Sequence, residues 1–253
     1  MSAGLLSFAW RGLVRAPGRT LVRVAALAAA VALLAAMLVF VSHALRSMTG
    51  SAIRSVPLDW QGPVASYAAA QRVASGVARQ PDVRYAMPAA TAPFAGLEHS
   101  AAGVGTIRAG SGAILAVPTN YARDFRTFRF LRGSLRTGEI VFDQQLAATL
   151  QVQPGDSIAL TVTPGTKPLR FRVSGIALVT SADVLFQPLN PLIGPAPAQP
   201  PANVAILPVG TFARTVAPHL GPASSAAATL PGAPAGVQWQ VQTKVDPASL
   251  QRA

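Results

Sequence analysis

The sequence lacks cysteine and holds only three histidines, His43, His99 and His219. Without cysteine the chain can form neither a disulfide scaffold nor a thiolate nucleophile. The cellular compartment stays open, because many bacterial extracytoplasmic domains fold without disulfides. The histidines are far apart, and no pair of them has the spacing of metal ligands on a helix. The sequence therefore excludes thiol chemistry and predicts no metal site.

Acidic residues are also scarce, with 9 Asp and Glu against 21 Lys and Arg, which gives a formal net charge of +12. A chain this basic suggests nucleic acid or an anionic membrane surface as a partner. Half of the excess lies in residues 1–54, which hold six arginines and no acid. The position of the charge therefore favours a membrane over nucleic acid.

Motifs for nucleotide binding and for hydrolysis are missing as well. No Gly-x-x-x-x-Gly-Lys-Ser/Thr loop occurs, and the nearest sequence, at residues 165–168, is typical of a hairpin turn. No Gly-x-Ser-x-Gly sequence is present either. We therefore expect no enzymatic activity and no bound cofactor. Any ATP would be bound by a separate partner subunit.

One long apolar run is present near the N-terminus. Residues 24–41 read VAALAAAVALLAAMLVFV, and the uncharged stretch continues to residue 45. At about 1.5 Å per residue, a helix over 24–45 spans roughly 33 Å, enough for a hydrocarbon core of about 30 Å. We predict a transmembrane helix over 24–45. The alternative is a cleaved signal peptide, whose apolar stretch is usually shorter.

The arginines around this run predict its direction. Four precede it and two follow it, and short flanks rich in Lys and Arg stay in the cytoplasm. Residues 1–23 are therefore predicted to be a cytoplasmic, basic and amphipathic segment, and residues 46–253 an extracytoplasmic domain. The segment is either a short helix in the membrane interface, interrupted at Pro17-Gly18, or a simple topogenic charge cluster. The arginines before the run are Arg11, Arg15, Arg19 and Arg23.

Small residues recur along the predicted span. They lie three or four positions apart, which would let another helix approach closely. Alanine is abundant throughout the sequence, so the same pattern also fits an unpartnered anchor. The predicted helix contacts are Ala25, Ala28, Ala29, Ala32 and Ala36.

The outer region shows alternating helix and strand patterns. Helical spacing predicts a helix over 67–79, and short apolar runs predict strands over 83–87, 103–108 and 114–117. The clearest stretch is 139–180: it predicts a strand over 139–143, a helix over 144–150, a turn at 153–156 and a hairpin closed by Pro164-Gly165. The proline-rich tail from 184 to 234 is predicted to be loop with short strands, followed by a strand over 236–241. A helix flanked by strands indicates the α+β class.

Basic and aromatic residues interleave between Tyr121 and Arg136. A solvated strand face is the simplest interpretation, with phenylalanines buried and arginines in water; a patch for an anionic lipid or a protein partner is the next. Nucleic-acid binding would use the same residue types, but the predicted topology places the segment outside the cytoplasm. The residues are Arg123, Arg126, Arg129, Arg132 and Arg136 with Phe125, Phe128 and Phe130.

Three stretches together carry a family resemblance. They are LLSFAWRGLVRAPGRTLVRVAALAAAVALLAAMLVF, VPLDWQG and FRTFRFLRGSLRTGEIVFDQQLAATLQVQPGDSIAL, the last with Arg132-Gly133, a strand, a small helix and a Gly155-Asp156 turn. In their order and spacing they resemble the N-terminal half of FtsX/MacB-type ABC transporter permeases. The resemblance covers nearly all of the chain.

The resemblance implies a non-catalytic permease subunit in the plasma membrane of a bacterium. Its fold would be α+β: one transmembrane helix, then an extracytoplasmic, porter-like α/β domain with a β-rich insertion at roughly 121–210. Its partners would be an ATP-binding subunit, further permease helices or a second permease copy, and the lipid bilayer, with no nucleic acid. The family has three more membrane helices that this sequence lacks, so we expect a truncated permease or a fragment. The alternative is a stand-alone single-span protein whose outer domain binds a protein or lipid partner.

Overall fold

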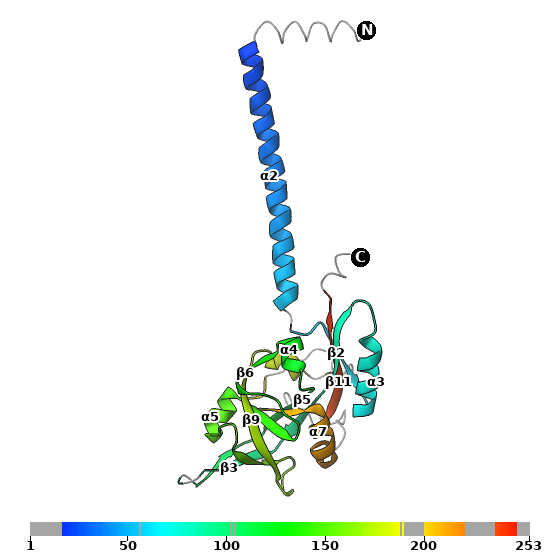
Figure 1. The fold of residues 1–253 in the computed structure, drawn as a ribbon, viewed down its shortest axis with the longest axis vertical. Coiled ribbons are helices and arrows are strands. Elements are labelled where there is room, and N and C mark those ends of the chain that lie inside the picture. Colours follow the sequence, from blue (N-terminus) through cyan, green and yellow to red (C-terminus); the bar gives the residue numbers. More distant parts are fainter. Residues whose placement is uncertain are drawn as a thin grey trace. The chain divides into compact units, whose positions relative to one another are not determined.

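The computed structural model describes residues 17–55, 57–101, 103, 105–187, 189, 200–220 and 236–246. The chain divides into two compact units, Met1–Ser55 and Val56–Ala253. In its described part the first unit is a single helix, whereas the second contains every described strand (Figure 1). An apolar helix followed by a mixed sheet domain confirms the predicted α+β class.

Helix α2 (Pro17–Ser55) is 39 residues long. It begins at Pro17, where proline fits the first turn because the missing N–H would have no helical partner there. Within it, Leu21–His43 is the one described segment long and apolar enough to cross a membrane, and its side chains are fully exposed within the chain. The apolar helix is confirmed, and it starts earlier and continues further than residues 24–45.

The second unit is built on one mixed sheet of eleven strands within the described residues. The order is β1-β11-β2-β5-β10-β7-β9-β8-β3-β4, and β6 pairs with β9. The pairs β5–β10 and β7–β9 are parallel and the others are antiparallel. The strands are β1 (Trp60–Val64), β2 (Val83–Phe94), β3 (Gly96–Ala101), β4 (Gly105–Ala109), β5 (Gly112–Val117), β6 (Phe128–Gly133), β7 (Glu139–Asp143), β8 (Ser157–Thr161), β9 (Leu169–Val179), β10 (Val204–Pro208) and β11 (Gln238–Val245).

Helices cover both faces of this sheet, so its central strands are buried on both sides. In β10, Ala205 and Leu207 belong to one core cluster, whereas Val204 and Ile206 belong to the other. The first cluster also contains α5 (Gln144–Leu150) and α7 (Val209–Thr215), and the second contains α4 (Tyr121–Phe125) and α6 (Ala182–Leu185). Helix α3 (Tyr67–Val77) packs at the β1–β11–β2 end through Ala70 and Ala74. A short 3-10 helix, Ala217–His219, follows α7.

The stretch 139–180 folds as predicted, because its signals are local. The Asp143 side chain caps α5 by accepting a hydrogen bond from the Gln145 N–H at 3.1 Å, and its other carboxylate oxygen accepts one from the Val179 N–H. The predicted hairpin is β8–β9, and Gly165 in its turn has φ +79°. The boundaries of β7 and α5 equal the predicted ones.

Other predicted boundaries were wrong. The strand expected over 83–87 extends to Phe94, and the one expected over 103–108 is β4, which begins and ends slightly later and pairs with the unpredicted strand β3. The tail, expected to be mostly loop, contributes β10 to the middle of the sheet and also α7. The predicted β-rich insertion at 121–210 contributes β6 to β10 to the same sheet as the rest of the domain, and its boundaries stay a prediction.

The first and last strands of the sheet are neighbours. β1 pairs antiparallel with β11, with Trp60 opposite Thr243. Asp59 strengthens this pairing on both sides: its N–H donates to the Thr243 carbonyl, and its carboxylate accepts from the Val245 N–H at 2.8 Å. The first and last described strands of the second unit therefore lie side by side.

Candidate functional site

The predicted topology arginines lie in or before helix α2. Arg11 and Arg15 lie outside the described residues. Arg19 is within the helix, but its side chain is not described, and Arg23 is exposed on the helix surface. Their topogenic role stays a prediction.

The five predicted contact alanines are exposed on α2, like the rest of the span. At about 100° of rotation per residue, they fall within one stripe roughly 100° wide. A stripe of this width suits the packing of one neighbouring helix. No other described segment of the chain covers it, so a helix contact here stays a prediction.

The basic and aromatic cluster forms an open groove of about 590 Å³. The groove lies between α4 and β6. Its floor is apolar and its charge comes from three arginines. The lining residues are Thr119, Ala122, Arg123, Arg126, Phe128, Arg129 and Phe130.

Local backbone geometry places the arginines around this groove. Helix α4 ends where Arg126 adopts a left-handed conformation, with φ +57° and its N–H bonded to the Ala122 carbonyl. The chain then enters β6, where Phe128 is buried, Arg129 is exposed and Phe130 is half-buried. This alternation confirms the predicted strand face with buried phenylalanines. The alternation continues at Leu131, which lies on the exposed face with Arg129 and is 39% exposed, and it ends at Arg132, where the register shifts.

The five arginines of the predicted cluster do not act as one patch. Arg132 donates to Gln153 Oε1 at 2.6 Å, and Arg136 lies 3.4 Å from Ser134 Oγ. Neither of these two lines the groove. The sequence could not reveal this division, because the register shift in β6 and the left-handed residue set the directions of the side chains.

Within the groove, one arginine is paired and two are not. Arg123 Nε lies 3.1 Å from Asp124 Oδ1, and this hydrogen bond together with the carboxylate charge raises the pKa of Arg123. Asn120 Nδ2 donates to the other Asp124 oxygen at 2.8 Å. Among the described residues, no acceptor bonds to the guanidinium groups of Arg126 and Arg129, so these two cations are available to an anion.

Buried aromatic rings hold the groove in place. Tyr121 and Phe125, one helical turn apart, stack with centroids 4.7 Å apart, and Tyr121 also stacks near Phe128 at 6.0 Å. The Tyr121 hydroxyl donates to Gln242 Oε1 on β11. Burial raises the pKa of Tyr121, so the phenol stays neutral at physiological pH. The groove thus rests on a rigid part of the domain.

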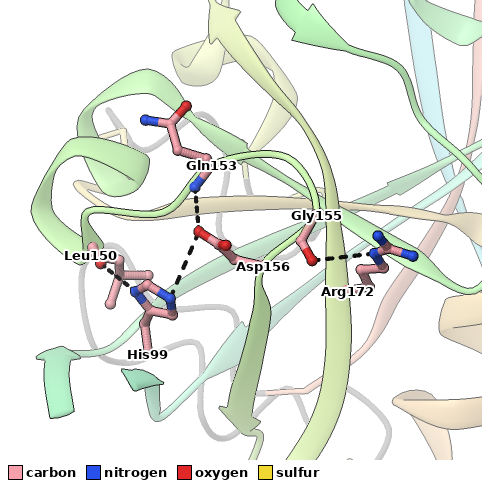
Figure 2. Close-up of polar contacts among 6 residues, drawn as sticks. All are labelled: His99, Leu150, Gln153, Gly155, Asp156 and Arg172. Carbon is pink, nitrogen blue, oxygen red and sulfur yellow. Dashed lines mark hydrogen bonds and ion pairs between the residues drawn. The ribbon is translucent and has the colours of Figure 1, made fainter. Parts of the chain in front are cut away.

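A second polar contact was missed in the sequence. His99 on β3 is buried, and its Nδ1 lies 2.9 Å from the carbonyl oxygen of Leu150 at the end of α5 (Figure 2). Because a carbonyl only accepts hydrogen bonds, Nδ1 carries the proton. On the other side of the ring, Nε2 lies 3.8 Å from Asp156 Oδ2, which also accepts from the Gln153 N–H at 2.7 Å. These residues tie β3 to the turn after α5, and we assign them a structural role.

Replacing His99 by leucine is expected to destabilise the chain by about 1 to 3 kcal/mol, because the buried Leu150 carbonyl would lose its partner. The measurement is urea unfolding of the full chain in detergent, followed by tryptophan fluorescence. The control is His219→Leu, since the His219 side chain is exposed and its replacement should change stability by less than about 0.5 kcal/mol. Equal stability of the two variants would contradict the assigned role.

Within the described residues, no three His, Cys, Asp or Glu side chains lie close enough to share a metal ion. The expectation that the chain itself binds no cofactor stays a prediction.

Comparison with solved structures found similar folds. The chain is similar to the periplasmic region of MacB from Actinobacillus actinomycetemcomitans, with 14% identity, 72% of this chain and 69% of that chain covered, and a TM-score of 0.43. It is also similar to a domain of a permease protein from Porphyromonas gingivalis, with 12% identity, coverage of 77% and 69%, and a TM-score of 0.41. No protein-family model matches the chain, and no curated protein matches it in sequence.

Proposed function

We propose that this chain is a permease subunit, or the N-terminal part of one, of an FtsX/MacB-type ABC transporter, and that it transmits movement rather than catalysing a reaction. The observation that carries this proposal is the pairing of β1 with β11, which puts the first and last described strands of the outer unit side by side. A domain whose first and last strands are adjacent can be inserted between two membrane helices without a long connecting segment. The sequence resemblance described above points to the same arrangement.

The length of α2 supports a mechanical role. The helix continues for a further 12 residues after the span Leu21–His43, which is roughly 18 Å of unbroken helix. A continuous helix transmits displacement better than a flexible linker does. A shift of the span, caused by ATP binding in a cytoplasmic partner, would therefore be passed along the helix toward the outer unit.

The proposal includes an orientation and a set of partners. The excess of arginine before the span favours a cytoplasmic N-terminus in the plasma membrane and an outer unit on the opposite side. The partners would be an ABC ATP-binding subunit, the remaining permease helices or a second permease copy through the alanine stripe, and the bilayer. Nucleic acid would not be a partner on that side of the membrane.

A second candidate function is a stand-alone single-span protein whose outer unit binds a partner at the membrane surface. The observation that favours it is the groove with two arginines that no described acceptor pairs. This function would need no ATPase.

Site-specific photo-cross-linking separates the two. A photoreactive amino acid at Arg11, in native membranes, is expected to give an adduct with an ATP-binding subunit, identified by mass spectrometry of its nucleotide-binding loop. The matched control carries the probe at Lys167, an exposed residue in the β8–β9 turn, and should not give this adduct. The permease proposal fails if the probe gives no such adduct at Arg11, Arg15 or Arg19, or if the same adduct forms from Lys167.

A further inference from the structure

The groove between α4 and β6 has both cationic and apolar surfaces. Arg126 and Arg129 offer guanidinium groups that no described residue engages, and Arg123 adds a third cation at the rim. Between them lies an apolar floor that includes Ala122 and the half-buried Phe130. A ligand that satisfies both parts has an anionic head joined to an apolar body.

Guanidinium groups bind phosphate and carboxylate heads alike, so a phosphodiester is one anion that fits them. A phosphodiester carries its charge on two oxygens, which match the planar fork of arginine donors. Arg123 is already engaged by Asp124 at 3.1 Å, so the two other arginines are the ones free to form such bonds.

The apolar surface around the groove favours a lipid over an acidic protein segment. Ala122, Phe128 and the half-buried Phe130 line the groove beside its arginines. An acidic peptide would be held by the arginines alone and would leave these side chains in water. An acyl chain would cover them, and burial of apolar surface would add to the affinity.

The buried cluster that contains Phe128 of the groove also contains a residue from the start of the second unit. Leu58, the third residue of that unit, belongs to the same buried cluster as Tyr121, Phe125 and Phe128. Only residues 44–57 separate Leu58 from the end of the span.

We propose that this groove binds an anionic phospholipid of the bilayer, with the phosphate held by Arg126 and Arg129 and the first acyl carbons against Phe130 and Ala122. The site does not depend on the permease role, since it involves only residues of the outer unit. Bound lipid would fix the outer unit at the membrane surface. The interaction would be specific for anionic headgroups and would weaken in high salt.

The test uses the full chain in detergent and native mass spectrometry, with phosphatidylglycerol and phosphatidylcholine of equal acyl length as probes. The variant Arg126→Gln/Arg129→Gln is expected to weaken phosphatidylglycerol binding by at least about tenfold, as expected for two lost arginine contacts. Its matched control is Arg170→Gln/Arg214→Gln, which removes two exposed charges outside the groove and should change binding less than about twofold. Phosphatidylcholine binding should be the same in all variants.

A second variant tests the apolar half of the site. Phe130→Ala should weaken phosphatidylglycerol binding by about threefold or more, because an acyl contact is lost. The proposal is overturned if the variants Arg126→Gln/Arg129→Gln and Arg170→Gln/Arg214→Gln weaken phosphatidylglycerol binding equally, because the lipid would then be attracted by net charge alone. It is likewise overturned if Arg126→Gln/Arg129→Gln does not weaken binding. It is also overturned if a poly-glutamate peptide displaces the lipid while Phe130→Ala has no effect, since the occupant would then be an acidic protein segment.

Discussion

Replacing Gly133 by alanine is expected to destabilise the outer unit by about 3 kcal/mol or more. Gly133 lies opposite Gly175 where β6 and β9 pair, and its φ of +68° is one that L side chains rarely adopt. A Cβ atom at this position would collide with the carbonyl oxygen of Ser174 and lie 2.9 Å from the Cα of Gly175. Because these neighbours are backbone atoms, the two strands would have to separate.

The matched control is Gly138→Ala. Gly138 has a similar φ, +83°, but a Cβ there would meet no atom within 4 Å. The free energy of unfolding of this variant should fall by only about 1 kcal/mol, which is the cost of placing an L side chain at positive φ. Urea unfolding of the full chain in detergent, followed by tryptophan fluorescence, measures both, because Trp239 packs against the core. Equal losses in the two variants would show that the close approach of β6 and β9 contributes nothing.

Replacing both Val31 and Leu34 by arginine is expected to release the chain from the membrane. The two residues lie in the middle of Leu21–His43. An arginine at the centre of a membrane helix raises the free energy of membrane insertion by about 2.5 to 3.5 kcal/mol. A combined penalty of about 5 to 7 kcal/mol exceeds what the remaining leucines and alanines can offset. The measurement is the fraction of chain that stays with the membrane after extraction at alkaline pH.

The control for this experiment is Val31→Leu/Leu34→Val, which keeps the apolar character and should stay in the membrane fraction. N-terminal sequencing of the unaltered mature chain distinguishes an anchor from a cleaved signal peptide, since cleavage would place the new N-terminus after residue 43. Membrane retention of the double-arginine variant would contradict an anchor at Leu21–His43.

The sequence predicted the elements whose signals are local. Asp143 caps the helix that follows it, and Pro164-Gly165 marks the turn between the two alternating strands β8 and β9. The limits of β7 and α5 therefore agree with the prediction. The tail was misread because β10 is buried on both faces, so that Val204–Leu207 is a short apolar run without alternation, close to several prolines.

The candidate site was predicted only in part. The sequence indicated a basic and aromatic segment with its phenylalanines buried, and the structure confirms this for Phe125 and Phe128, whereas Phe130 is half-buried. It could not show that Arg132 turns to Gln153 while Arg126 and Arg129 remain at the groove. It also missed the contact of His99 with Leu150, because 51 residues separate them and only strand pairing brings them together.

The sequence by itself determined the apolar helix, the asymmetry of charge around it and the α+β class, because run length, charge count and periodicity are properties of neighbouring residues. The tertiary structure decided which strands lie in the centre of the sheet, which arginines share the groove, and that the first and last strands pair. These features depend on pairing between segments that are distant in the sequence, such as Phe128 with Val179, Ala113 with Val204 and Trp60 with Thr243. Burial of apolar side chains on both faces of the sheet stabilises those contacts, and the pattern of neighbouring residues does not predict them.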